Sequence, residues 1–280
     1  MTRYISVSTG AYDGYDPPEI LASLHRCGVQ NVELAFIKGY VNDFSDADLN
    51  PAFAADLRSE MQRLGQRCLT FSGHINLGDE EALSQFRTRV AFARETGAVR
   101  FLTNSSTVAT AGRFFRLVPE ITAIARDAGM IICLENPGDG VDNLFNSAAD
   151  IPGLLEKLDR EVFSVNYDAG NLASHRPRLD VIRDTLEAVP YANHLHVKDI
   201  IRSADGYRFC ALGEGDIDYR RLLAAVSEQA PDLSFSLELP FRLRRTPEGK
   251  PYKEDQPLPL AVIEDKIRQS INFVNDVLKQ

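Results

Sequence analysis

The stretch MIICLE at residues 130–135 decides the fold, because it is a short apolar run that ends abruptly in a glutamate. Three further runs have the same form: VFSVNYD ends in Asp168, YANHLH ends in His196, and LSFSLE ends in Glu238. Apolar runs of this length, separated by helical stretches, are typical of buried parallel strands. The carboxyl ends of the strands of a closed parallel barrel converge, so these four side chains are predicted to share one site.

The side chains of Glu135, Asp168, His196 and Glu238 form a set of hard, mainly oxygen ligands. Such a set suits one divalent cation per chain, with Mn²⁺ as the first choice and Mg²⁺ or Co²⁺ as alternatives. A structural role for the two glutamates, as salt-bridged barrel residues, is the less favoured alternative. His194 has the same strand parity as His196, and we favour His196 because it lies nearer the mouth of the barrel.

Strand-like and helix-like segments alternate along the chain. The expected strands are Tyr4–Ser8, Asn31–Phe36, Arg67–Ser72, Ala98–Thr103, Met130–Glu135, Val162–Asp168, Ala192–Val197 and Leu233–Leu239. The expected helices are Pro17–Cys27, Pro51–Leu64, Glu80–Glu95, Arg113–Ala128, Ile151–Leu158, Leu179–Val189, Asp218–Glu228 and Leu260–Leu278. Eight strand–helix pairs in strict order predict an α/β fold of the (β/α)₈ TIM barrel type, as a single domain over residues 1–280.

A long, polar segment with several prolines, Arg242–Pro259, follows the last expected strand. Segments that follow the last strand are typical of active-site flaps or of oligomer contacts, and we expect one of these two roles here. If the segment forms an oligomer contact, we expect a homodimer or homotetramer. The arginines Arg242, Arg244 and Arg245 could bind a substrate phosphate, although no glycine-rich phosphate loop is visible in the sequence.

The composition limits the classes of partner. A formal net charge of −9 argues against a nucleic-acid groove, which needs clustered Lys and Arg, so small solutes are the expected partners. The first ten residues, MTRYISVSTG, lack the form of a signal peptide, and no apolar run approaches the roughly 18 residues of a membrane span. We therefore expect a cytoplasmic protein that has no membrane partner.

Six short motifs lie at the expected strand ends and loops. They are VELAF at 32–36, CLENP at 133–137, NYDAGN at 166–171, HLHVKD at 194–199, ALGEGDID at 211–218 and SLELP at 236–240. With these motifs, nearly the whole chain resembles the xylose isomerase-like family of TIM barrels, which includes sugar isomerases, ketose 3-epimerases and inosose dehydratases. The resemblance implies one divalent metal held by the four strand-end residues, with oxygens of a carbohydrate substrate completing its coordination.

The resemblance also implies roles in catalysis. Glu135 and Glu238 would act as acid and base on opposite faces of the carbon that loses its proton, which gives a sugar isomerase or epimerase working through an enediolate. Arg202 stands six residues after His196, where similar epimerases have an arginine that binds a substrate hydroxyl. Asn171 stands where many members have histidine, and it is still expected to donate a hydrogen bond to the substrate.

Other functions stay open beside this one. Lys198, within HVKD, resembles the dehydratase branch and indicates a substrate contact, so a lyase acting on a keto-polyol or a 3-keto-glycoside is the main alternative. His74 either contacts substrate or bonds a neighbour, and Glu33 either binds substrate or forms an internal ion pair. A non-catalytic sugar-binding barrel is less favoured. The related three-zinc endonuclease arrangement is disfavoured, because it needs more histidines than the five present.

Overall fold

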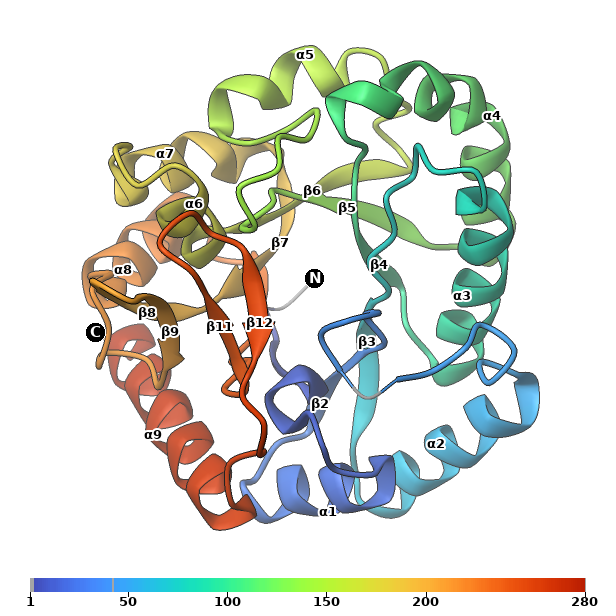
Figure 1. Cartoon of the computed structure of the whole chain (residues 1–280). Helices are drawn as coiled ribbons and strands as arrows, with labels where there is room; N and C mark the ends of the chain where they lie inside the picture. Colours follow the sequence, from blue (N-terminus) through green and yellow to red (C-terminus); the bar gives the residue numbers. More distant parts are fainter. Residues whose placement is uncertain (1–2, 42, 280) are drawn as a thin grey trace.

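The computed structural model describes residues 3–41 and 43–279, so residues 1, 2, 42 and 280 of the expected domain lie outside the described residues. Eight parallel strands form a closed barrel in the order β1-β10-β7-β6-β5-β4-β3-β2, as Figure 1 shows. The strands are β1 Ile5–Ser8, β2 Asn31–Ala35, β3 Arg67–Ser72, β4 Arg100–Asn104, β5 Ile131–Glu135, β6 Phe163–Asp168, β7 Ala192–Val197 and β10 Ser234–Leu237. The predicted single-domain TIM barrel is therefore confirmed.

A ring of helices surrounds the barrel (Figure 1). The α-helices are α1 Pro17–Arg26, α2 Pro51–Arg63, α3 Ala82–Thr96, α4 Ala111–Ala128, α5 Ile151–Leu155, α6 Ala169–His175, α7 Val181–Ala188, α8 Tyr219–Gln229 and α9 Leu260–Leu278. Short 3₁₀ turns are η1 Thr9–Tyr12, η2 Val108–Thr110, η3 Ala148–Asp150 and η4 Val189–Tyr191. Gly97 and Gly129 end α3 and α4 with φ angles of 100° and 64°, a left-handed conformation that glycine adopts readily.

Helix α6 lies between the expected strand Val162–Asp168 and the expected helix Leu179–Val189, where the sequence predicts no element. It begins directly at the end of β6, where the Asp168 side chain accepts a hydrogen bond from the backbone N–H of Asn171. The carboxylate thus caps the helix in the way that aspartate commonly does. Smaller differences occur at helix ends: α5 stops at Leu155 instead of Leu158, and α3 begins at Ala82 instead of Glu80.

A second, antiparallel sheet lies outside the barrel. It consists of β8 Asp199–Ser203, β9 Gly206–Cys210, β11 Leu243–Arg245 and β12 Pro251–Lys253, in the order β12-β11-β9-β8. The segment expected to form a flap thus contains the β11–β12 hairpin, which lies in front of the barrel strands in Figure 1. The sequence pattern does not predict this sheet.

The layer between strands and helices is rich in phenylalanine on one side. Phe71 on β3 stacks on Phe101 on β4, with ring centroids 5.7 Å apart, and Phe86 of α3 meets Phe101 edge-on at 5.3 Å. All three side chains are fully buried. This apolar layer fixes the strands, while the barrel interior is polar: Tyr4 Oη lies 2.9 Å from Thr70 Oγ1 and accepts a hydrogen bond from Arg100. No helix in the described part of the chain is both long and apolar enough to cross a membrane.

Candidate metal centre and substrate pocket

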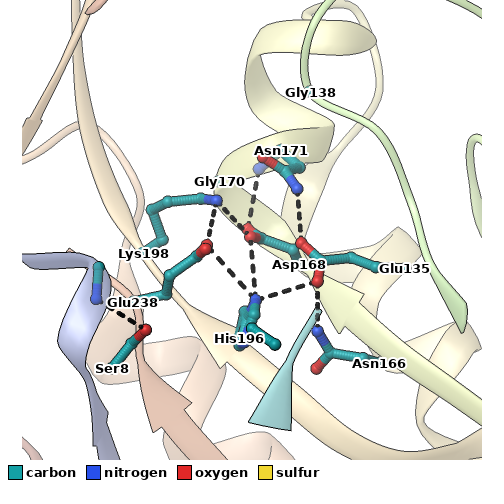
Figure 2. A network of polar contacts seen from close by, with 12 residues as sticks. Ser8, Glu135, Gly138, Asn166, Asp168, Gly170, Asn171, His196, Lys198 and Glu238 are labelled. Carbon is teal, nitrogen blue, oxygen red and sulfur yellow. Dashed lines mark hydrogen bonds and ion pairs between the residues drawn. The ribbon is translucent and has the colours of Figure 1, made fainter. Parts of the chain in front are cut away.

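The four side chains predicted to share a site do meet at the carboxyl ends of the strands, as Figure 2 shows. Glu135 ends β5, Asp168 ends β6, His196 lies on β7 and Glu238 directly follows β10. Nδ1 of His196 is 3.1 Å from Oε2 of Glu135, 3.4 Å from Oε2 of Glu238 and 3.8 Å from Oδ2 of Asp168. Because each side chain comes from a different strand, the barrel itself sets their spacing. These four residues are called the cage below.

The donor atoms of the cage fit a cation. One ligand atom from each residue lies within 4.8 Å of the other three, and all four residues are buried. Nδ1 of His196 faces the three carboxylates of the cage, and Oδ2 of Asp168 also lies 2.7 Å from Nζ of Lys198. Three buried carboxylates grouped around one imidazole are a donor set that suits a divalent ion, which would balance their negative charge. The cage is therefore a candidate metal centre.

The opposite edge of the His196 ring is bound by Glu33 on β2. Nε2 of His196 lies 3.1 Å and 3.2 Å from the two oxygens of Glu33, and Ser72 donates a hydrogen bond of 3.0 Å to the same carboxylate. A proton on Nε2 leaves the lone pair of Nδ1 directed at the cage, which is the arrangement of metal-binding histidines. Glu33 is fully buried and is not among the described residues that line the pocket. The structure thus places Glu33 as a partner of His196, outside the described lining of this cavity.

His194, the other candidate on β7, lies deeper in the barrel. Its Nε2 is 2.8 Å from Oγ of Ser236 and 3.8 Å from Glu33, and it does not face the three carboxylates of the cage. Burial lowers the pKa of His194 to about 3, so this imidazole is neutral near neutral pH. The structure brings His196, and not His194, to the cage.

The charges of the cage alter the proton affinities of its members. Burial alone would lower the pKa of His196, but Glu135, Glu33 and Glu238 raise it well above its usual value. Without a cation the imidazole therefore holds a proton, and a metal ion must displace it to reach Nδ1. Burial would likewise raise the pKa of Glu135, yet His196 and His74 hold it below its usual value.

Glu135 is fixed by two asparagine amides. Nδ2 of Asn166 donates to Oε2 at 2.6 Å, and Nδ2 of Asn171 donates to Oε1 at 2.8 Å. His74 approaches from the pocket side, with Nε2 3.4 Å from Oε2 and Nδ1 2.6 Å from Oδ1 of Asn104. Asn171 and His74, both predicted as substrate contacts, thus lie beside Glu135 at the pocket.

Lys198 places a positive charge between two carboxylates of the cage. Its Nζ is 2.7 Å from Oδ2 of Asp168 and 2.5 Å from Oε2 of Glu238. Burial, reinforced by Glu135 and Glu238 and opposed by Lys198, raises the pKa of Asp168 to about 6. Burial would also raise the pKa of Glu238, but Lys198 and His196 hold it well below its usual value. Burial would lower the pKa of Lys198, but these carboxylates raise it, so the ammonium stays charged.

A cavity of about 200 Å³ opens above the cage. Among the cage residues, Glu135 and Glu238 line it, and His74, Asn171 and Lys198 also contribute to its wall. Arg202 is not among the described residues that line this cavity. It lies exposed on β8, and its guanidinium is 5.9 Å from the centre of the Tyr207 ring. Both residues line a different depression of the surface. The structure does not bring Arg202 to the cage.

Asn136, Asn166 and the contact between Arg245 and Asn171 were not expected from the sequence. Asn136 fixes Asp168 through two hydrogen bonds, from its Nδ2 to the backbone carbonyl and from the backbone N–H to its Oδ1. Asn166 holds Glu135, and Arg245 of β11 donates a hydrogen bond to Oδ1 of Asn171. Asn136 stands next to Glu135, and Asn166 shares the strand parity of Asp168, so both could have been found from the sequence. Nothing in the sequence connects Arg245 with Asn171.

The comparisons with known proteins agree with the barrel fold. A sequence profile described as xylose isomerase-like TIM barrel matches residues 21–258. No curated protein sequence matches the chain significantly. A D-psicose 3-epimerase from Clostridium cellulolyticum H10, solved with D-tagatose, superposes with a TM-score of 0.74 at 12% identity, over 98% of this chain and 99% of that one.

Two further solved structures have the same fold. The probable 3-DHS dehydratase AsbF from Bacillus anthracis, involved in petrobactin synthesis, has a TM-score of 0.68 at 14% identity and covers 98% of this chain and 99% of its own. A xylose isomerase-like TIM barrel protein from Mycobacterium smegmatis in complex with magnesium also has a TM-score of 0.68, at 16% identity, over 99% of this chain and 97% of its own. At these identities the similarity shows a common fold.

Proposed function

Because the chain belongs to the xylose isomerase-like TIM barrel family, we propose that it is a divalent-metal-dependent isomerase or epimerase of a monosaccharide or keto-sugar. The profile match confirms the family that the sequence motifs indicated. One observation carries the proposal: within the cage, Glu135 and Glu238 are the described residues that also line the cavity. Two carboxylates held on either side of His196 can therefore reach the same substrate carbon from different directions.

Glu135 and Glu238 are assigned as the two proton-transfer groups. One carboxylate removes the proton from the carbon next to the substrate carbonyl, which gives an enediolate, and the other returns a proton. Return to the opposite face of the same carbon gives an epimer, and return to the neighbouring carbon gives an isomer. The short hydrogen bonds from Asn166 and Asn171 keep Glu135 oriented during this exchange.

The four residues of the cage would hold the cation, with Mn²⁺ preferred and Mg²⁺ or Co²⁺ as alternatives. When bound, the cation supplies stabilisation of the negative charge that develops on the carbonyl oxygen of the substrate. His196 contributes Nδ1 because Glu33 holds its Nε2, and Asp168 is fixed by Asn136. Lys198, His74 and Asn171 bind and orient the oxygens of the substrate at the cavity wall.

The main alternative is a lyase that eliminates water from a keto-polyol or an aglycone from a 3-keto-glycoside. It begins with the same proton removal and needs an acid to protonate the leaving oxygen. Lys198 lines the cavity and could serve as this acid. The isomerase or epimerase is preferred because Glu135 and Glu238, the two carboxylates that its proton transfers need, both line the cavity. A non-catalytic sugar-binding barrel is less favoured, because buried carboxylates are costly to keep without a catalytic or metal-binding role.

The test has two parts. The metal content of protein purified without tags or chelators and supplied with Mn²⁺ is measured by elemental mass spectrometry, and about one ion per chain, lost in Glu238→Ala, is expected. Ketoses, keto-sugar acids, sugar phosphates, inososes and 3-keto-glycosides are then incubated with the enzyme in D₂O. Deuterium at a carbon next to the carbonyl, in a product of unchanged formula, supports the proposal. A product lighter by water or by an aglycone identifies the lyase.

Two results would overturn the proposed enzyme altogether. Absence of bound metal would remove the centre on which the proton transfer depends. A shift of melting temperature with these sugars, without exchange or product in any of them, would identify a binding protein.

A further inference from the structure

Arg245 is a buried cation that has no acidic partner. Its side chain is only 1% exposed, and no ion pair joins it to a carboxylate among the described residues. Nη1 donates to Oγ of Ser174 at 2.5 Å and Nη2 donates to Oδ1 of Asn171 at 2.8 Å, while Nε has no partner. A guanidinium has five N–H donors, so the neighbouring protein groups use fewer than half of them.

The two nearby arginines differ in this respect. Arg242 forms an ion pair of 3.3 Å with Asp13, and Arg244 forms one of 3.0 Å with Glu254. Of the three arginines whose side chains could have bound phosphate, Arg245 is the one that lines the cavity above the cage. Arg244 and Arg245 are adjacent on β11, so they point to opposite faces of the hairpin.

The guanidinium of Arg245 is held firmly in this position. Its central carbon lies 5.2 Å from the centre of the Phe209 ring, a cation–π contact with the outer sheet. It also lies against the backbone of Gly138, where an added Cβ would come within 2.2 Å of Nη1. A fixed guanidinium needs little further ordering when it binds an anion, which favours affinity.

We propose that the substrate carries an anionic group, a carboxylate or a phosphate, and that Arg245 binds it. The inference rests on the proposed function and narrows it to acidic sugars, namely keto-sugar acids or sugar phosphates. A planar oxyanion accepts paired hydrogen bonds from a guanidinium, and burial strengthens the attraction. Neutral sugars leave the charge of Arg245 without a partner, so the pocket distinguishes the two classes.

Arg245 also connects the anion to the reacting end of the substrate. Its Nη2 donates to Oδ1 of Asn171, and Nδ2 of the same amide donates to Oε1 of Glu135. The guanidinium thereby fixes which way the Asn171 amide faces, because only the oxygen can accept from Arg245 and only the nitrogen can donate to Glu135. An anion bound at Arg245 therefore lies at a fixed distance from the carboxylate that moves the proton.

The experiment measures binding by the full chain loaded with Mn²⁺. Three probes share a ketose skeleton: 2-keto-D-gluconate carries a carboxylate, D-fructose 6-phosphate carries a phosphate and D-fructose is neutral. The wild-type protein is expected to bind at least one of the two anions about tenfold or more tightly than D-fructose in isothermal titration. Which anion binds more tightly identifies the group that Arg245 accepts.

Substitutions assign the preference to Arg245. Arg245→Gln is expected to weaken anion binding by about 30-fold or more, because a buried charge partner is lost, and to weaken D-fructose binding far less, so that the preference for the anion disappears. Arg244→Gln on the same strand is the matched control and keeps the wild-type preference. Arg245→Lys retains the charge without the paired donors, so its affinity for the anion should lie between those of the wild type and Arg245→Gln. If Arg245→Gln does not fold, as judged by circular dichroism, the Arg245→Lys variant and the wild-type preference decide the question.

The inference is overturned if the wild-type protein prefers D-fructose, if it binds neither anion, or if Arg245→Gln and Arg245→Lys leave its preference intact. These results are separate from those that test the proposed function. Anion preference that depends on Arg245, without deuterium exchange in any sugar, supports the inference and counts against the isomerase. Exchange that occurs in neutral ketoses alone supports the isomerase and overturns the inference.

Discussion

Nε2 of His196 lies 3.1 Å from Oε2 of Glu33, so a carboxylate on β2 orients a candidate metal ligand on β7. Both side chains are fully enclosed within the barrel. The contact spans the interior, because β10 and β1 separate β7 from β2 in the strand order. The ligand set at the strand ends is therefore supported by a residue from another strand, one layer below the cavity.

Glu33→Gln is expected to lower metal affinity by about 10–100-fold, because the neutral amide no longer fixes the proton on Nε2 of His196. Titration with Mn²⁺ followed by elemental analysis measures the affinity. Glu214→Gln, at an exposed position, is the control and should bind metal like the wild type. Equal affinity of the two variants would show that Glu33 has no part in holding the ligand.

Glu135→Gln and Glu238→Gln are each expected to lower the rate of solvent-deuterium exchange by about 10²–10⁴-fold, since an amide cannot accept the substrate proton. The metal content of each variant is measured in parallel, so that loss of the cation is distinguished from loss of the base. Glu156→Gln, at an exposed position, should exchange like the wild type. A metal-loaded variant of either cage glutamate with the wild-type rate would disprove the two-base assignment.

Phe101→Ala is expected to lower the free energy of unfolding by about 3–5 kcal/mol, because it leaves a cavity in the aromatic layer between β4 and α3. Phe101 is fully buried against Phe71 and Phe86. Equilibrium unfolding in urea measures the change. Val108→Ala, at a side chain that is 62% exposed, should stay within about 0.5 kcal/mol of the wild type.

His175 should make stability depend on pH. Its Nδ1 accepts a hydrogen bond from the backbone N–H of Gly140 at 3.2 Å, and its Nε2 lies 3.0 Å from Oδ1 of Asn146, so the imidazole is neutral in the folded protein. Burial, together with the charge of Arg176, lowers its pKa below the usual 6.5. Between the lowered value and 6.5 the unfolded chain binds a proton that the folded chain does not, so stability falls as the pH drops through this window.

His175→Gln should therefore lose less stability than the wild type between about pH 7 and pH 5, because glutamine does not titrate. Urea unfolding at several pH values gives the slope for each protein. His25→Gln, at an exposed position on α1, should keep the wild-type slope. A wild-type slope in His175→Gln as well would mean that this histidine does not contribute to the pH dependence.

The eight barrel strands could be predicted because each is an apolar run between helical stretches. Such a run can be recognised from a few consecutive residues, without knowledge of the tertiary fold. The outer sheet could not, because β11 pairs with β9 across more than thirty residues and neither strand has a continuous apolar run. Such pairing depends on the tertiary fold rather than on local pattern. Helix α6 was missed because its start depends on the Asp168 side chain acting as a cap.

The residues of the site also divide into those that the local pattern predicts and those whose position depends on the tertiary fold. Glu135, Asp168, His196 and Glu238 could be predicted because strand ends converge in any parallel barrel. Arg202 was placed by its spacing from His196, but β8 leads its side chain away to the exposed face of the outer sheet. The sequence indicated Arg245 only as one of three arginines able to bind a phosphate. Its place beside Asn171 could not be predicted, because the hairpin that carries it has to fold back over α6 before its guanidinium reaches Asn171.

Closure of the barrel has a consequence for biosynthesis. β1 pairs with β10, with Ile5 opposite Phe235, and Glu238 directly follows β10. The ribosome makes the strands of Glu135, Asp168 and His196 before it makes β10 and Glu238, which follows it. At about 5–20 residues per second, the nascent chain spends several seconds with β1 and β7 as open sheet edges. The fourth residue of the cage arrives with the strand that closes these edges, so the candidate metal centre is complete only after translation of β10 and Glu238.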